Sequence, residues 1–152
     1  MTAAEAVAEY GAATLIAEAI KATAPRKGRR LACASDVAAY FRASLGLLAA
    51  EEFWTIALDV RHRVIEQRMI ARGSLTGVEV HPREVFRPLI ACSAAAVLLV
   101  HNHPSGLAEP SREDIDLTRR LREVGEICGI AVLDHVVVAA EGFVSLADRG
   151  WA

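Results

Sequence analysis

The chain of 152 residues contains 53% hydrophobic and 24% charged residues and carries a net charge of −2 at pH 7. These values indicate a globular chain that can bury one sizeable core, and they exclude a disordered one. The near balance of charges also differs from that of a dedicated nucleic-acid binder, which usually shows a basic domain or stripe.

The three cysteines, Cys33, Cys92 and Cys128, are odd in number and far apart in the sequence, which excludes a disulfide framework. Cys92 and Cys128 stand in apolar surroundings, so we expect both to be small core residues. The N-terminus lacks the basic start and apolar block of a signal peptide, and no apolar run reaches the roughly 20 residues of a membrane span. These observations predict a cytoplasmic protein without a membrane segment.

Residues 1–30 are expected to form a helix and a basic linker ahead of the main domain. Apolar residues recur at helical spacing over residues 3–23, and Pro25 ends this pattern. The basic run that follows can be a solvated linker or a patch that contacts phosphate groups; it contains Arg26, Lys27, Arg29 and Arg30.

From residue 31 onward, the sequence predicts helices and strands in alternation. Residues 94–100 are a continuous apolar run, which is typical of a central strand buried on both faces. Ser111 is expected to begin a long helix that Gly129 ends, with its buried side formed by Ile115, Thr118, Leu121, Val124 and Ile127. The other expected elements are helices from Ser35 to about Leu48 and from Pro82 to about Ser93, and strands at 53–58, 64–70, 130–139 and 143–145. This order predicts an α/β domain with a mixed sheet.

The segment after the apolar run contains a candidate metal site. His101 and His103 are two residues apart, so in an extended segment both imidazoles point to the same side, and neutral imidazole is a common zinc ligand. Asp114, in the first turn of the next helix, supplies a carboxylate, with Asp116 as an alternative. Three protein ligands and one open position are typical of catalytic zinc. Alternatively, Ser111 and Asp114 fit a capping box.

A hydrolytic site also needs a base and a group that stabilises an oxyanion. Glu51 and Glu52 stand where the first strand begins, and either carboxylate can accept a proton from a metal-activated water; they can also be a solvated strand start. Ser111 can donate to an oxyanion, or simply cap its helix.

These residues resemble a known family pattern. His101-x-His103, seven residues, Ser111, two residues and Asp114 resemble the JAMM motif of the JAB/MPN+ metalloprotease superfamily. The string His-Asn-His-Pro-Ser-Gly, followed by Glu-Pro-Ser-x-x-Asp, looks like the RadC family, whose members are often labelled DNA repair proteins. The likeness extends over about residues 35–151, with further agreement at residues 51–59, 73–84 and 133–135.

The resemblance implies a cytidine-deaminase-like, three-layer α/β fold of the JAB/MPN type for residues 31–152. It implies one zinc ion per chain on His101, His103 and Asp114, with Glu51 as the catalytic base and Ser111 assisting the tetrahedral intermediate. The superfamily's reaction is hydrolysis of a peptide or isopeptide bond in a peptide or protein substrate.

Several alternatives stay open at the level of sequence. The family label and the basic run suggest a DNA-repair accessory protein or nuclease, although residues 1–30 lack the Gly-h-Gly turn of the family's helix-hairpin-helix region. A closed structural zinc site would need a fourth ligand, for which Cys128 and His135 are candidates. The pair Asp134-His135 can orient a ligand or be purely structural. An exposed strand edge could pair two chains into a homodimer.

Overall fold

The computed structural model describes residues 27–46, 48–73 and 79–151. The predicted helix over residues 3–23 lies outside the described residues. The described chain contains three helices and five strands: α2 (Ala34–Leu45), β1 (Glu52–Leu58), β2 (Val64–Arg72), α3 (Pro82–Ala91), β3 (Ala96–Asn102), α4 (Arg112–Cys128), β4 (Ala131–Ala139) and β5 (Gly142–Ser145). Among the described helices, none is both long and apolar enough to cross a membrane.

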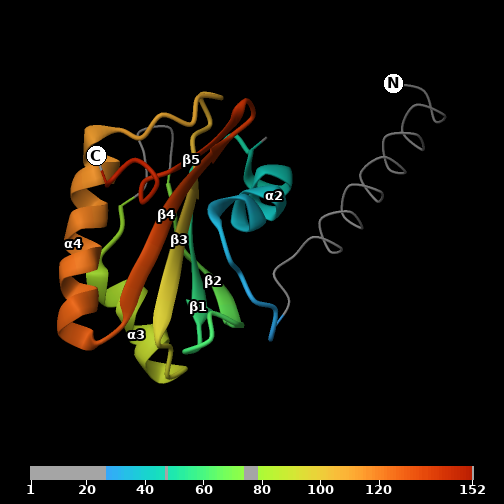
Figure 1. The fold of residues 1–152 in the computed structure, drawn as a ribbon. Coiled ribbons are helices and arrows are strands. Elements are labelled where there is room, and N and C mark those ends of the chain that lie inside the picture. The colour runs from blue at the N-terminus through green and yellow to red at the C-terminus, as the bar shows by residue number, and fades with distance from the viewer. Residues whose placement is uncertain (1–26, 47, 74–78, 152) are drawn as a thin grey trace, which may run out of the picture.

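The five strands form one mixed sheet in the order β2-β1-β3-β4-β5. Strands β3 and β4 are parallel, and the crossover between them contains α4; every other neighbouring pair is antiparallel. Helix α2 lies on one face of the sheet, and α3 and α4 lie on the other (Figure 1). The predicted α/β class, with a mixed central sheet flanked by helices, is confirmed.

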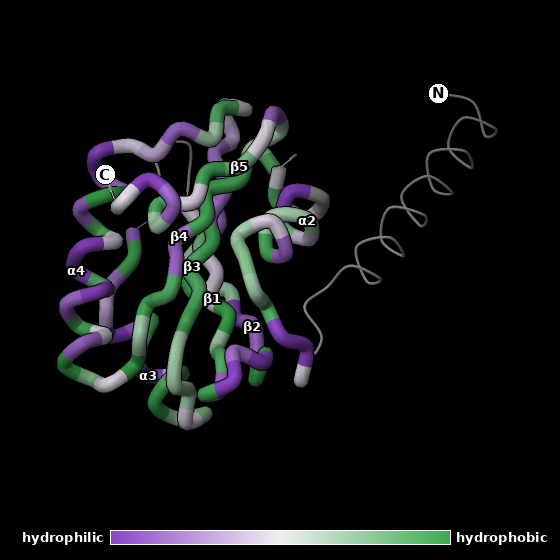
Figure 2. The backbone as a smooth tube through the Cα atoms, in the orientation of Figure 1, coloured by the Kyte–Doolittle hydropathy of each residue, from purple (hydrophilic) through white to green (hydrophobic). Residues whose placement is uncertain are grey.

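Strand β3 separates two cores and is buried along its whole length. Ala96, Leu98 and Val100 pack in the core that α2 covers, whereas Val97 and Leu99 pack in the core that α3 and α4 cover. Figure 2 shows this strand as an apolar line through the middle of the sheet. The prediction of a central strand buried on both faces is therefore confirmed, but the strand continues two residues further than the apolar run.

Helix α4 begins and ends where the sequence predicts. Ser111 is its N-cap, and Gly129 caps its C-terminus with a φ of +72°, which suits glycine. The buried line consists of Thr118, Leu121 and Gly125. The expected burial of Ile127 is wrong, because its side chain is 86% exposed. An α-helix turns by about 100° per residue, so Ile127, which is nine residues after Thr118, lies on the opposite side of the helix.

Cys128 is also exposed, so the prediction that it is a core residue is wrong; Cys92 is partly buried. Each of these cysteines lies at the end of a helix on the outer layer. Local apolar neighbours in the sequence did not reveal that the last turn of α4 extends past the core.

Gly125 allows α4 to lie close to the start of β4. A Cβ atom added there would lie 2.5 Å from the backbone oxygen of Ile130 and 3.3 Å from a methyl group of Val132. We expect Gly125→Ala to lower the free energy of unfolding by about 1–3 kcal/mol through overpacking, despite the gain of about 1 kcal/mol that alanine normally brings to a helix.

Chemical denaturation of Gly125→Ala beside Gly142→Ala tests this expectation. A Cβ atom at Gly142 meets nothing within 4 Å, so this control should stay within about 0.5 kcal/mol of the wild type. A Gly125→Ala protein as stable as the control would show that α4 moves outward at no cost.

Candidate metal centre

The candidate site lies where β3 ends and α4 begins. His101 is in β3 and pairs with Phe53 of β1 and Val137 of β4, so both neighbouring strands hold its backbone. His103 follows the last strand residue, and its N–H donates to the oxygen of Val138 at 2.9 Å. The carboxyl end of a parallel strand is where ligands usually bind in α/β sheets.

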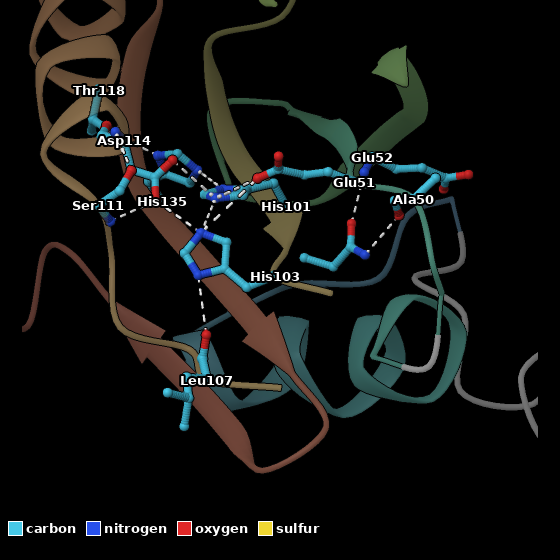
Figure 3. Close-up of polar contacts among 11 residues, drawn as sticks. Ala50, Glu51, Glu52, His101, His103, Leu107, Ser111, Asp114, Thr118 and His135 are labelled. Carbon is cyan, nitrogen blue, oxygen red and sulfur yellow. Dashed lines mark hydrogen bonds and ion pairs between the residues drawn. The ribbon is translucent and has the colours of Figure 1, made fainter. Parts of the chain in front are cut away.

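Four side chains converge at this edge. One ligand atom from each of Glu51, His101, His103 and Asp114 lies within 4.8 Å of the others. The Nε2 atom of His101 is 3.0 Å from that of His103 and 3.2 Å from Oδ1 of Asp114. Oδ2 of Asp114 is 2.9 Å from Nε2 of His103. Figure 3 shows these groups pointing at a common centre. Two imidazole nitrogens and a carboxylate oxygen are a donor set that fits zinc.

Asp114 caps its helix and faces the two histidines at the same time. Its backbone N–H donates to Oγ of Ser111 at 3.1 Å, while its Oδ2 accepts from the backbone N–H of Ser111 at 2.8 Å. The capping box and the metal-ligand arrangement are therefore compatible. Burial acts to raise the pKa of Asp114, but the close contacts with the rings of His101 and His103, together with the hydrogen bond from the backbone N–H of Ser111, hold the pKa well below its usual value.

His103 is oriented by a backbone carbonyl. Its Nδ1 lies 3.1 Å from the oxygen of Leu107, which can only accept, so Nδ1 carries the proton and Nε2 faces the cluster. The hydrogen bond to Asp114 raises the pKa of His103, although burial opposes this shift. In the absence of a metal, the site thus retains a proton on this ring at a higher pH than an isolated histidine would.

The ring of His101 is buried and contacts a third histidine. Nδ1 of His101 lies 2.7 Å from Nε2 of His135, and Nδ1 of His135 lies 2.6 Å from Oγ1 of Thr118. Burial lowers the pKa of His135 well below its usual value, so this ring is neutral. Asp134 points away from this chain: its carboxylate accepts from Ser145 and from the backbone of Ala147. The side chains of Asp134 and His135 therefore lie on opposite faces of the sheet.

Glu51 is placed by an asparagine that lies between the two histidines. The side chain of Asn102 accepts from the N–H of Glu52 at 2.7 Å and donates to the oxygen of Ala50 at 3.0 Å. This pair of bonds holds the backbone on both sides of Glu51, whose Oε1 lies 3.6 Å from Nε2 of His101. The side chain of Glu52 points the other way (Figure 3), accepts from Trp54 and pairs with Arg72.

The structure thus brings together Glu51, His101, His103 and Asp114, with Ser111 beside Asp114 as its helix cap. It does not bring in three alternatives weighed from the sequence: Glu52, Asp116, which pairs with Arg119, and Cys128. Lys27, Arg29 and Arg30 are exposed, and Arg26 lies outside the described residues; their contact with DNA stays a prediction.

Asn102 and Thr118 support the site in the structure but were not predicted from the sequence to do so. Asn102 had one signal in the sequence, because a polar residue at the end of a strand buried on both faces needs buried partners. Thr118 had another, because it stands four residues after Asp114 and so lies on the same face of the helix.

Comparison with known proteins agrees with the family resemblance seen in the sequence. A family model described as "RadC-like JAB domain" matches residues 31–151. A UPF0758 protein of Syntrophotalea carbinolica is 52% identical over 125 residues, which cover 82% of this chain and 55% of the relative. A UPF0758 protein of Geobacillus thermodenitrificans is 46% identical over 119 residues, or 78% of this chain and 53% of the relative. The chain spans about half the length of the curated relatives it matches.

Removal of both imidazoles tests whether this cluster binds metal. We expect about one zinc ion per wild-type chain, by the donor set above, and loss of most of it in the His101→Ala/His103→Ala double variant. Elemental analysis of purified protein after exposure to zinc and dialysis measures this. His81→Ala removes an imidazole outside the cluster and should retain the metal. Equal zinc in the wild type and the double variant would refute the assignment.

Metal affinity should depend on pH in a defined direction. Asp114 raises the pKa of His103, so a bound metal must displace a proton that this ring retains above the usual pKa of histidine. As the pH falls through that raised pKa, zinc affinity should drop by about tenfold per pH unit for one competing proton. Titration of zinc against a chelator across a series of pH values measures the slope, and an affinity that stays flat into the acid range would contradict it.

Proposed function

Because this chain belongs to the RadC family of JAB-domain proteins, we propose that it is a zinc-dependent metallohydrolase that cleaves a peptide or isopeptide bond. The observation that carries this proposal is the convergence of two imidazoles and two carboxylates within 4.8 Å at one end of β3. A zinc ion on this donor set would supply Lewis acidity, which lowers the pKa of a coordinated water to about 7.

The two carboxylates of the cluster are suited to different roles. Asp114 approaches both histidines at 2.9–3.2 Å, and its Oδ2 is fixed by the N–H of Ser111. Glu51 stays further out, with Oε1 at 3.6 Å from Nε2 of His101 and 4.0 Å from that of His103. We therefore assign Asp114 as a metal ligand and Glu51 as the general base.

Glu51 would accept the proton of the attacking water and return it to the nitrogen of the leaving amine. A base must lie within direct or one-water reach of the proton that it removes, and the position of Glu51 at the edge of the ligand cluster meets this requirement. Since the amine leaves poorly as an anion, the returned proton is needed for the C–N bond to break.

Ser111 would stabilise the developing oxyanion. Its Oγ already accepts from the backbone N–H of Asp114, which leaves its own O–H free to donate to a carbonyl oxygen of the substrate. Loss of one such donor typically costs about 2.7–4 kcal/mol of transition-state stabilisation. Capping the helix and donating to the substrate are therefore compatible roles for one hydroxyl.

The composition of the cluster favours catalysis over a structural metal site. Structural zinc is usually closed by four protein ligands that are rich in cysteine. Within residues 27–46, 48–73 and 79–151, no cysteine joins the cluster, and His135 contacts His101 instead of facing the common centre. The donor set also suits zinc better than Mg²⁺, which prefers oxygen ligands.

A pair of neighbouring glutamates provides the test. We expect Glu51→Gln to retain zinc and lose at least about 100-fold in hydrolysis, which is the usual contribution of a general base. Glu52→Gln changes the next residue, whose side chain points away from the cluster, and should retain activity. Because the substrate is not assigned, hydrolysis is followed by mass spectrometry on a proteome-derived peptide library and on isopeptide-linked protein conjugates.

Two results would count against this function. If the zinc-loaded wild type cleaved no peptide or isopeptide bond in either set, the proposed reaction would be refuted. If Glu51→Gln cleaved as fast as Glu52→Gln, the assignment of the base would be refuted while the metal site could stand.

A further inference from the structure

A chain of buried hydrogen bonds runs from the first turn of α4, through two side chains, to His101. Oγ1 of Thr118 lies 2.6 Å from the backbone oxygen of Asp114 and 2.6 Å from Nδ1 of His135. Nε2 of His135 then lies 2.7 Å from Nδ1 of His101. Thr118, His135 and His101 are each no more than 1% exposed, so water does not compete for these bonds.

The direction of every bond in this chain follows from its first member. A backbone carbonyl can only accept, so the single hydroxyl proton of Thr118 is donated to Asp114. Toward His135 the hydroxyl can therefore only accept, and Nδ1 of His135 must carry a proton. In a neutral imidazole the other nitrogen is bare, so Nε2 of His135 accepts from Nδ1–H of His101.

We propose that Thr118 and His135 are positioning residues that hold His101 in the tautomer whose bare Nε2 faces the metal. This proposal rests on the assignment of His101 as a metal ligand in the proposed function. Thr118 and His135 would affect the metal only through His101. The bare nitrogen it assigns lies on the same side as Nε2 of His103 and the carboxylate of Asp114.

The opposite arrangement leaves buried groups unsatisfied. If Nε2 of His135 donated to His101, then a neutral His135 would have a bare Nδ1 facing Thr118, whose only proton is already donated. Two acceptors would then lie 2.6 Å apart between side chains that are no more than 1% exposed. A doubly protonated His135 would avoid this conflict only by burying a cation whose ring contacts among the described residues are His101 and Thr118, with no carboxylate, which is costly.

The nature of the partner also affects the ligand. A carboxylate that accepts from a ligating histidine makes its imidazole more basic. Here the acceptor is a neutral imidazole, so His101 gains a fixed orientation with less added charge donation to the metal. With a metal bound, this arrangement would maintain the Lewis acidity that the proposed hydrolysis requires, since weaker donation would leave the metal more electron-poor.

Thr118 offers a matched pair of variants. Thr118→Val keeps the shape of the side chain and removes the hydroxyl, whereas Thr118→Ser keeps the hydroxyl. We expect Thr118→Val to weaken zinc binding by about 10-fold, in the range found for groups that orient metal ligands, and Thr118→Ser to bind within about 3-fold of the wild type. Competition with a chelator measures affinity, and thermal unfolding of the metal-free proteins shows whether each variant is folded.

A second measurement does not depend on a variant. Imidazole ¹⁵N chemical shifts of the wild type report which nitrogen of each ring carries a proton. We expect His135 to be protonated at Nδ1 and bare at Nε2, both with and without zinc, whereas a role confined to packing predicts no particular tautomer.

The outcomes separate this inference from the proposed function. Equal zinc affinity of folded Thr118→Val and Thr118→Ser, or an Nε2-protonated His135, would overturn the positioning role while the metal centre stands. Absence of zinc binding by the wild type would overturn both.

Discussion

The full burial of β3 is the constraint on which the rest of the site depends. A strand covered on both faces can carry polar side chains only if each one finds a partner inside the protein. His101 and Asn102 extend this buried strand beyond its apolar run, and they point to opposite sides of the sheet. Their partners come from separate parts of the chain. His101 contacts His135 of β4, whereas Asn102 bonds the backbone of the segment 50–52. Satisfying two buried polar groups therefore assembles the surroundings of the candidate metal centre.

Helix α4 connects the core to the chemistry. Its close approach at Gly125 sets how its axis lies against β4, and its first turn carries a carboxylate that both caps the helix and faces the histidines. Thr118, one turn further along, reaches the backbone of Asp114 and the ring of His135. Packing along one side of a single helix thus positions Asp114 directly and His101 through Thr118 and His135, and both Asp114 and His101 are proposed metal ligands.

Much of this arrangement could be predicted from the sequence, because the relevant signals are local. The alternation of apolar runs and helical periods predicted the elements, and the spacing of His101, His103 and Asp114 predicted the cluster, since a strand end and the next helix start are necessarily close. The choice between Glu51 and Glu52 needed the register of β1, which alternates side chains between two faces. The opposite orientations of Asp134 and His135 have the same origin. The predicted buried side of α4 took every third residue up to Ile127. Because a helix has about 3.6 residues per turn, such a line drifts around the helix, and it reaches the exposed side at Ile127.

Residues 101–103, where β3 ends, position several groups of the site. The outer two supply imidazoles, and the middle one anchors the backbone of Glu51 from the opposite face of the sheet. Glu51, the proposed base, and the proposed ligands His101 and His103 are thus all positioned by the same short peptide. The separation between the Glu51 carboxylate and the two imidazoles therefore depends on one strand end, and positional errors do not accumulate across several elements.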